Sequence, residues 1–166
     1  MTQPMKILRV DSSAKIENSE SRRLTDRIID GLKTNGKSLE VTVRDLNKSL
    51  PQVNTAWIEA NNTASDDQTD EHKKTLELSN TLVGEIEAAD TLIVGVALYN
   101  FSITASLKLW IDLVCRARKT FAYVDGSPKG LMTGKKAIIC FASGGTPFES
   151  ILPIQSDPIT LNGQDH

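Results

Sequence analysis

The chain has 166 residues, a length that suits one domain with a single hydrophobic core. Hydrophobic residues make up 39% of it and charged residues 24%; its net charge is −2 with no basic cluster, which argues against a nucleic acid partner. No apolar run reaches the roughly 18 residues of a membrane helix, and the amino terminus lacks a signal-peptide pattern, so we expect a cytoplasmic protein with no membrane partner. Cys115 and Cys140 lie in apolar segments, so we expect neither a disulfide nor a metal site.

Strand and helix patterns alternate through the first half of the chain. Lys6–Val10 predicts a strand, and Ser21–Lys33 predicts a helix that Asn35-Gly36 closes. Leu39–Arg44 alternates apolar and polar residues, which indicates a strand with one wet face or a strand at a sheet edge. The polar region Asn47–Gln68 is too long for a turn, and we expect it to cover one side of a site.

The same alternation continues in the second half. Helices are predicted over Asp70–Ala89 and Thr104–Ala117, and the apolar runs Thr91–Ala97 and Lys136–Phe141 predict strands buried on both faces. Together these elements predict an α/β fold with a parallel sheet. Because only the second strand suits an edge, we predict the doubly wound, flavodoxin-like strand order 2-1-3-4. Its site would lie at the carboxyl ends of strands one and three.

Each strand that should reach this site ends in a polar or aromatic loop. Ser12–Ser21 is rich in hydroxyls and precedes a helix, which favours a phosphate site, although Ser19 or Ser21 could equally be a plain helix cap. Leu98–Ser102 and Ala142–Thr146 follow the next two strands. Alone, these could be packing aromatics and an ordinary turn, but three such loops at one edge predict a ligand site. Hydroxyls, glycines and aromatic side chains suit the phosphate and planar ring of a flavin.

Over about residues 5–146 the sequence resembles the FMN-dependent NADH-azoreductases, which are flavodoxin-like NAD(P)H:quinone oxidoreductases. The resemblance rests on the serine loop, on Leu98-Tyr99-Asn100-Phe101 followed by Leu107-Lys108, and on a glycine-punctuated run from Arg116 and Thr120-Phe121 to Gly134-Lys135-Lys136-Ala137. It implies three groups of FMN-binding residues. These are Ser13, Ser19, Glu20 and Ser21 for the phosphate, Leu98, Tyr99, Asn100 and Phe101 for the isoalloxazine edge, and Ala142, Ser143, Gly144 and Gly145 for the pyrimidine end.

The resemblance also implies an activity. FMN would take hydride from NADH or NADPH and pass it to a quinone or azo compound in a second half-reaction, in a homodimer. No catalytic side chain is predicted, because the flavin carries the chemistry, and no nucleophile–base pair or metal cluster lies near the loops. Two alternatives stay open: a flavodoxin-type electron carrier, and a truncated family member without catalytic activity.

The sequence departs from the family in two places. Glu20 puts a carboxylate inside the phosphate loop, which is tolerable only if its side chain points to solvent. After residue 146 the fifth strand and last helix of the family are not recognisable, and three prolines occur in 147–166. We therefore expect a domain over 1–146 and a divergent tail over 147–166. Ala137–Phe141 would then form an exposed apolar edge.

Overall fold

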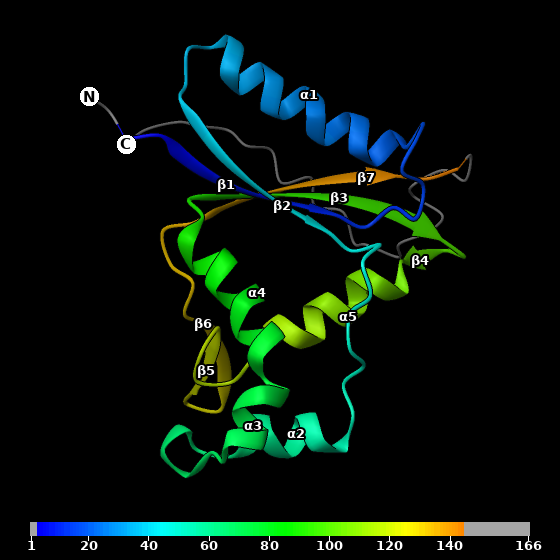
Figure 1. The fold of residues 1–166 in the computed structure, drawn as a ribbon. Coiled ribbons are helices and arrows are strands. Elements are labelled where there is room, and N and C mark those ends of the chain that lie inside the picture. Colours follow the sequence, from blue (N-terminus) through cyan, green and yellow to red (C-terminus); the bar gives the residue numbers. More distant parts are fainter. Residues whose placement is uncertain (1–2, 145–166) are drawn as a thin grey trace.

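The structure, a computed structural model, describes residues 3–144 of the chain. Its centre is a sheet of four parallel strands in the spatial order β2-β1-β3-β7 (Figure 1), which is the predicted order 2-1-3-4. A short fifth strand pairs antiparallel with the end of β3. The strands are β1 (Met5–Asp11), β2 (Leu39–Asp45), β3 (Thr91–Tyr99), β4 (Ser102–Ile103) and β7 (Lys136–Ala142).

Helices cover both faces of this sheet. Helix α1 (Glu20–Thr34) lies on one face, and α4 (Glu77–Ala88) and α5 (Ala105–Val114) lie on the other (Figure 1). Neighbouring residues of β1 point to opposite faces: Ile7 packs in the cluster under α1, whereas Leu8 packs in the larger cluster with α4 and α5. Burial on both faces explains why β3 is an almost continuous apolar run and why β1 carries apolar residues on both of its faces.

Two predicted segments differ from the structure. The helix expected over 70–89 is divided into α3 (Asp70–Thr75) and α4 at Leu76, whose side chain is buried in the larger core. The polar region 47–68 contains α2 (Thr55–Asn62) and the 3₁₀ turn η1 (Ser65–Asp67). Trp57 and Ala60 of α2 are buried in the larger core at the α4 side. No residue of 47–68 lines the cavity at the serine loop, so in the described chain this region does not cover that site.

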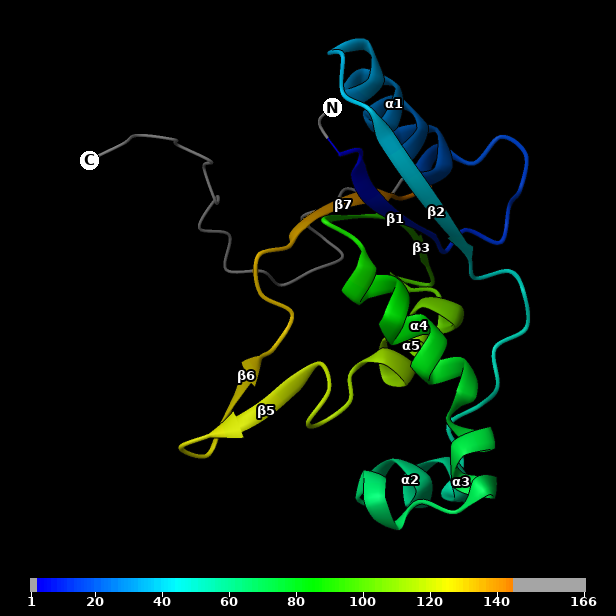
Figure 2. The ribbon, with the colours of Figure 1, turned by 60° about the vertical axis from the view of Figure 1, so that its left-hand side comes forward.

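A hairpin that the sequence analysis did not predict projects from the body of the molecule (Figure 2). Strands β5 (Phe121–Val124) and β6 (Ser127–Gly130) pair antiparallel across Asp125 and Gly126, which both have positive φ (51° and 78°). An Asp-Gly pair with this geometry is a typical two-residue hairpin turn, so a local signal for it was present.

Strand β7 is not buried on both faces as its apolar run predicted. Among the described residues it is an edge of the sheet, and only Cys140 of the strand is buried. Ile138, Ile139 and Phe141 are 37%, 47% and 40% exposed, which agrees with the expected apolar edge. Gly145, the tail 147–166 and the elements expected to be missing lie outside the described residues. Within residues 3–144, no helix is long and apolar enough to span a membrane.

Candidate functional site

A cavity of about 390 Å³ lies at the carboxyl ends of β1, β3 and β7, where the strand order places a site. All three predicted loops line it, through Ser13, Ser19, Glu20, Ser21, Leu98, Tyr99, Ala142, Ser143 and Gly144. Asn100 and Phe101 do not line the cavity but form the turn that follows β3. The predictions missed three further lining residues: Lys15, Asn18 and Ala97.

Ser19 is both a helix cap and a cavity residue, so the two interpretations of the loop are compatible. Its Oγ accepts a hydrogen bond from the Arg22 backbone N–H (3.5 Å) and lies 3.3 Å from the Oγ of Ser21. Both serines are buried. The backbone N–H groups of a helix's first turn have no acceptor within the helix and carry its positive dipole end. Glu20 and Ser21 supply those groups here, which suits an anion.

The segment Ser12–Ser19, which we call the serine segment, is fastened to β3 by two side chains. Ser12 Oγ donates to the Gly95 carbonyl (2.8 Å) and accepts from the Ala97 N–H (3.1 Å). The Tyr99 hydroxyl accepts from the Ala14 N–H (3.1 Å) and lies 3.4 Å from Ser13 Oγ. The hydrogen bond with Ser13, followed by those from the backbone, holds the pKa of Tyr99 below its ordinary value. Tyr99 therefore joins the third-strand loop to the first.

Helix α1 approaches β3 closely at Gly95. A Cβ atom on Gly95 would lie 3.2 Å from Thr25 Cγ2 and 3.3 Å from both Asp11 Oδ1 and the Ser21 carbonyl oxygen. These distances are shorter than ordinary van der Waals contact, so a side chain there would push the first turn of α1 away from the sheet. The glycine thus sets the depth at which Ser21 sits in the cavity.

The turn after β3 holds a strained aromatic residue. Tyr99 pairs with Ser102 across a two-residue turn in which Asn100 and Phe101 have φ of 49° and 64°. Asparagine tolerates this left-handed conformation, but for a bulky residue such as Phe101 it costs about 1–2 kcal/mol. Phe101 is also 70% exposed, so burial does not compensate the strain. Strained residues concentrate at ligand sites.

Charge around the cavity is compatible with an anion. The Glu20 side chain is 66% exposed and accepts a hydrogen bond from Arg23 Nη1 (2.7 Å), which fits the expectation that it points to solvent. Lys15 is the one basic side chain among the described residues that line the cavity. The negative charge of the Glu20 carboxylate is therefore partly neutralised by Arg23, and the Lys15 ammonium group is available to a phosphate.

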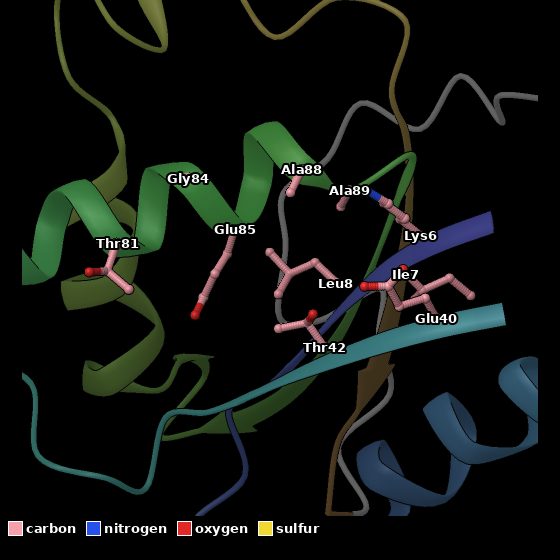
Figure 3. Close-up of a pocket in the computed structure, with 10 residues that line it drawn as sticks. All are labelled: Lys6, Ile7, Leu8, Glu40, Thr42, Thr81, Gly84, Glu85, Ala88 and Ala89. Atoms are coloured by element: carbon pink, nitrogen blue, oxygen red, sulfur yellow. The ribbon is translucent and has the colours of Figure 1, made fainter. Parts of the chain in front are cut away.

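A second cavity, of about 300 Å³, lies between α4 and the first halves of β1 and β2 (Figure 3). Leu8 of β1 and Ala88 of α4 line it from opposite sides, and the lining residue Glu85 is held by Arg44, whose Nε donates to Glu85 Oε2 (3.0 Å). The carboxyl-terminal half of α4 lines this cavity, and that half carries the negative end of the helix dipole. These features do not suit an anionic ligand, so the cavity at the serine segment is the candidate site.

Comparison with known proteins gives a family and several relatives. The family model for the flavodoxin-like fold matches residues 5–153. FMN-dependent NADH:quinone oxidoreductase 1 of Jannaschia sp. (strain CCS1) is 50% identical over 140 residues, which cover 84% of this chain and 71% of that protein. The protein of the same name from Hahella chejuensis (strain KCTC 2396) is 43% identical over 151 residues, covering 90% and 74%.

Solved structures of two azoreductases are also similar to this chain. The azoreductase from Bacillus anthracis str. Sterne aligns with a TM-score of 0.75 and 28% identity, covering 86% of this chain and 70% of that one. The FMN-dependent NADH-azoreductase from Bacillus anthracis str. Ames Ancestor, in complex with FMN, aligns with a TM-score of 0.71 and 25% identity, with the same coverage of 86% and 70%. The likeness therefore extends over nearly all the residues that the structure describes.

Proposed function

Because the chain belongs to the flavodoxin-like fold family, we propose that it is an FMN-dependent oxidoreductase that passes hydride from NADH to quinones or azo compounds. The observation that carries the proposal is the convergence on one cavity of the three loops to which the family resemblance assigned the FMN contacts. The names of the relatives support NADH as donor and quinones or azo compounds as acceptors.

The residues at the cavity fit FMN. The hydroxyls of Ser13, Ser19 and Ser21 and the first turn of α1 supply donors for a phosphate. A volume of about 390 Å³ is within the usual range for small-molecule sites. A Cβ atom on Gly144 would meet no atom within 4 Å, so the backbone there is open to a flat ring. Bound FMN would supply the hydride-accepting and hydride-donating centre, and the protein supplies binding and orientation.

In this proposal the predicted residues keep their assigned places. Ser13, Ser19, Ser21 and the Glu20 N–H bind the phosphate end. Leu98 and Tyr99 flank one edge of the isoalloxazine ring from the cavity lining, with Asn100 and Phe101 in the turn beside it, and residues 142–145 lie at its pyrimidine end. Residues 1–146 form the cofactor-binding domain. No side chain is assigned as acid, base or nucleophile, so substitutions in these loops should weaken FMN binding more than they slow a proton transfer.

We include a homodimer in the proposal. The β5–β6 hairpin stands away from the main sheet (Figure 2) and exposes Tyr123 by 68% and Val124 by 46%. Exposed apolar patches of this kind mark interaction surfaces, and a second copy would cover them. Gel filtration with light scattering should give twice the chain mass of 18.2 kDa. A cytoplasmic location also belongs to the proposal, and the free thiols of Cys115 and Cys140 are compatible with it.

The decisive experiment is a flavin titration followed by turnover. We expect the purified protein to bind FMN and to oxidise NADH when a soluble quinone or an azo dye is added. Binding of FMN without NADH oxidation would instead favour an electron carrier. Failure to bind added FMN would refute the proposal and favour the non-catalytic alternative.

A further inference from the structure

One arginine outside the cavity lining, Arg22, contacts the serine segment at three places. Its Nε donates to the Lys15 carbonyl oxygen (3.0 Å), and its Nη2 donates to the Ser13 carbonyl oxygen (3.0 Å). Its backbone N–H donates to the Ser19 hydroxyl, as described above. The side chain is only 12% exposed. Arg22 therefore fixes the beginning, middle and end of the segment to the first turn of α1.

The charge of Arg22 is already matched by two carboxylates. Its Nη1 and Nη2 form a two-pronged pair with Asp45, at 3.2 Å and 2.8 Å, and Nη1 lies 3.3 Å from Asp11 Oδ2. This pairing holds the pKa of Asp45 below its ordinary value. A guanidinium that is committed in this way is a poor direct ligand for a further anion. Any effect of Arg22 on the site must pass through the backbone that it holds.

Three consecutive carbonyl oxygens of the serine segment are held by side chains that do not line the cavity. Arg22 takes those of Ser13 and Lys15, and Asn47 Nδ2 donates to those of Ser13 (2.9 Å) and Ala14 (3.3 Å). Carbonyl oxygens carry partial negative charge and would repel a phosphate if they turned into the cavity.

We propose that Arg22 is a positioning residue for the anionic end of the cofactor, because it keeps the carbonyl oxygens of Ser13 and Lys15 out of the cavity and leaves the Ser13 hydroxyl lining it. This inference rests on the proposed function and names a residue that acts on the same site. Lysine cannot replace Arg22, because one ammonium group cannot reach two carbonyl oxygens and a two-pronged carboxylate together.

Substitution of Arg22 should leave the fold intact. Asp11 is a buried carboxylate that would lose its contact with Arg22, but it keeps a hydrogen bond from Arg9 Nε (2.8 Å) and one from Thr25 Oγ1 (3.4 Å). It is therefore not left as an unpaired buried charge, which is the usual reason that such variants unfold. Asp45 is partly exposed and can be solvated by water.

Comparison of FMN with riboflavin tests the inference, because the two share the ring and differ by the phosphate. For Arg22→Lys and Arg22→Gln we expect the FMN dissociation constant to rise about tenfold or more, while that of riboflavin changes less than about twofold. Quenching of flavin fluorescence measures both constants. Arg27→Gln, an exposed arginine on the same helix, is the matched control and should bind both flavins as the wild type does.

Two results would overturn the inference. One is FMN binding by both Arg22 variants as tight as in the wild type. The other is an equal loss of FMN and riboflavin, which would show a general loss of structure rather than a misplaced phosphate loop. If the wild-type protein binds neither flavin, the proposed function fails and the inference fails with it, so the two failures are distinguishable.

Discussion

Gly95→Ala tests how closely α1 must approach β3 for the site to form. The new methyl group would meet Thr25 Cγ2 at 3.2 Å and the Ser21 carbonyl at 3.3 Å, and neither atom belongs to a flexible side-chain end. Overpacking of this kind costs about 1–3 kcal/mol. Alanine also lowers the conformational entropy of the unfolded chain, which stabilises the folded protein by about 0.4–1 kcal/mol. From the middle of these two ranges, the free energy of unfolding should fall by about 1–2 kcal/mol, which lowers Tm by about 2–8 °C.

Urea unfolding measures the change in stability, and an FMN titration measures the effect on the site, where displacement of Ser21 should weaken binding severalfold. Gly84→Ala is the matched control: Gly84 lies inside α4, and a Cβ atom there would meet nothing within 4 Å. Because alanine favours a helix over glycine, this variant should gain about 1 kcal/mol with unchanged FMN binding. A Gly95→Ala protein that is as stable as the wild type and binds FMN equally well would refute the close-approach reasoning.

Three further substitutions separate charge, pH dependence and strain at the site. Glu20→Gln should tighten FMN binding about two- to fivefold at low salt, and the gain should shrink as salt screens the exposed carboxylate; titrations at two ionic strengths measure this. Asp45→Asn should remove about 1 kcal/mol of stability near neutral pH. Arg22 holds the pKa of Asp45 below its ordinary 3.8. The wild type should therefore be more stable than the variant above that pH, and the difference in free energy of unfolding should vanish as acid protonates the carboxylate. Urea unfolding across that pH range measures this difference. Phe101→Gly should leave the free energy of unfolding equal or higher by about 1 kcal/mol, because glycine accepts the positive φ, whereas the rate of NADH oxidation should fall. A variant with lower stability and full activity would contradict a functional role for the strain.

The sequence predicted the sheet and the position of the site because both follow from local patterns. Apolar runs marked β1 and β3, with Lys6 and Arg9 interrupting the run of β1, and alternation marked β2 as the outer strand. The predicted order rested on placing the alternating strand β2 at an edge, and it holds although β7 is an exposed edge as well. The placing of the loops at one end of the sheet followed from that order. The Ser19 cap was also predictable, since a serine before a helical pattern is a local signal.

Features that depend on distant residues were not predictable. Nothing in the sequence near Leu76 distinguishes one long helix from two, although the structure divides α3 from α4 at that residue. The contacts of Arg22 join residues up to 23 positions apart, so no periodicity reveals them. The β5–β6 hairpin is different, because its Asp125-Gly126 turn is a local signal that the sequence carries by itself.

These contacts change what a serine-rich loop before a helix can be taken to mean. Ser19 would cap α1 whether or not a phosphate binds, so the serine alone cannot distinguish a cap from an anion site. The difference lies in the acceptors that the loop must hide. Arg22 and Asn47 hold the carbonyl oxygens of residues 13–15 outside the cavity, a constraint that a simple helix cap does not need. A strand–helix loop should therefore bind an anion when its carbonyl oxygens, as well as its N–H groups and hydroxyls, have assigned partners.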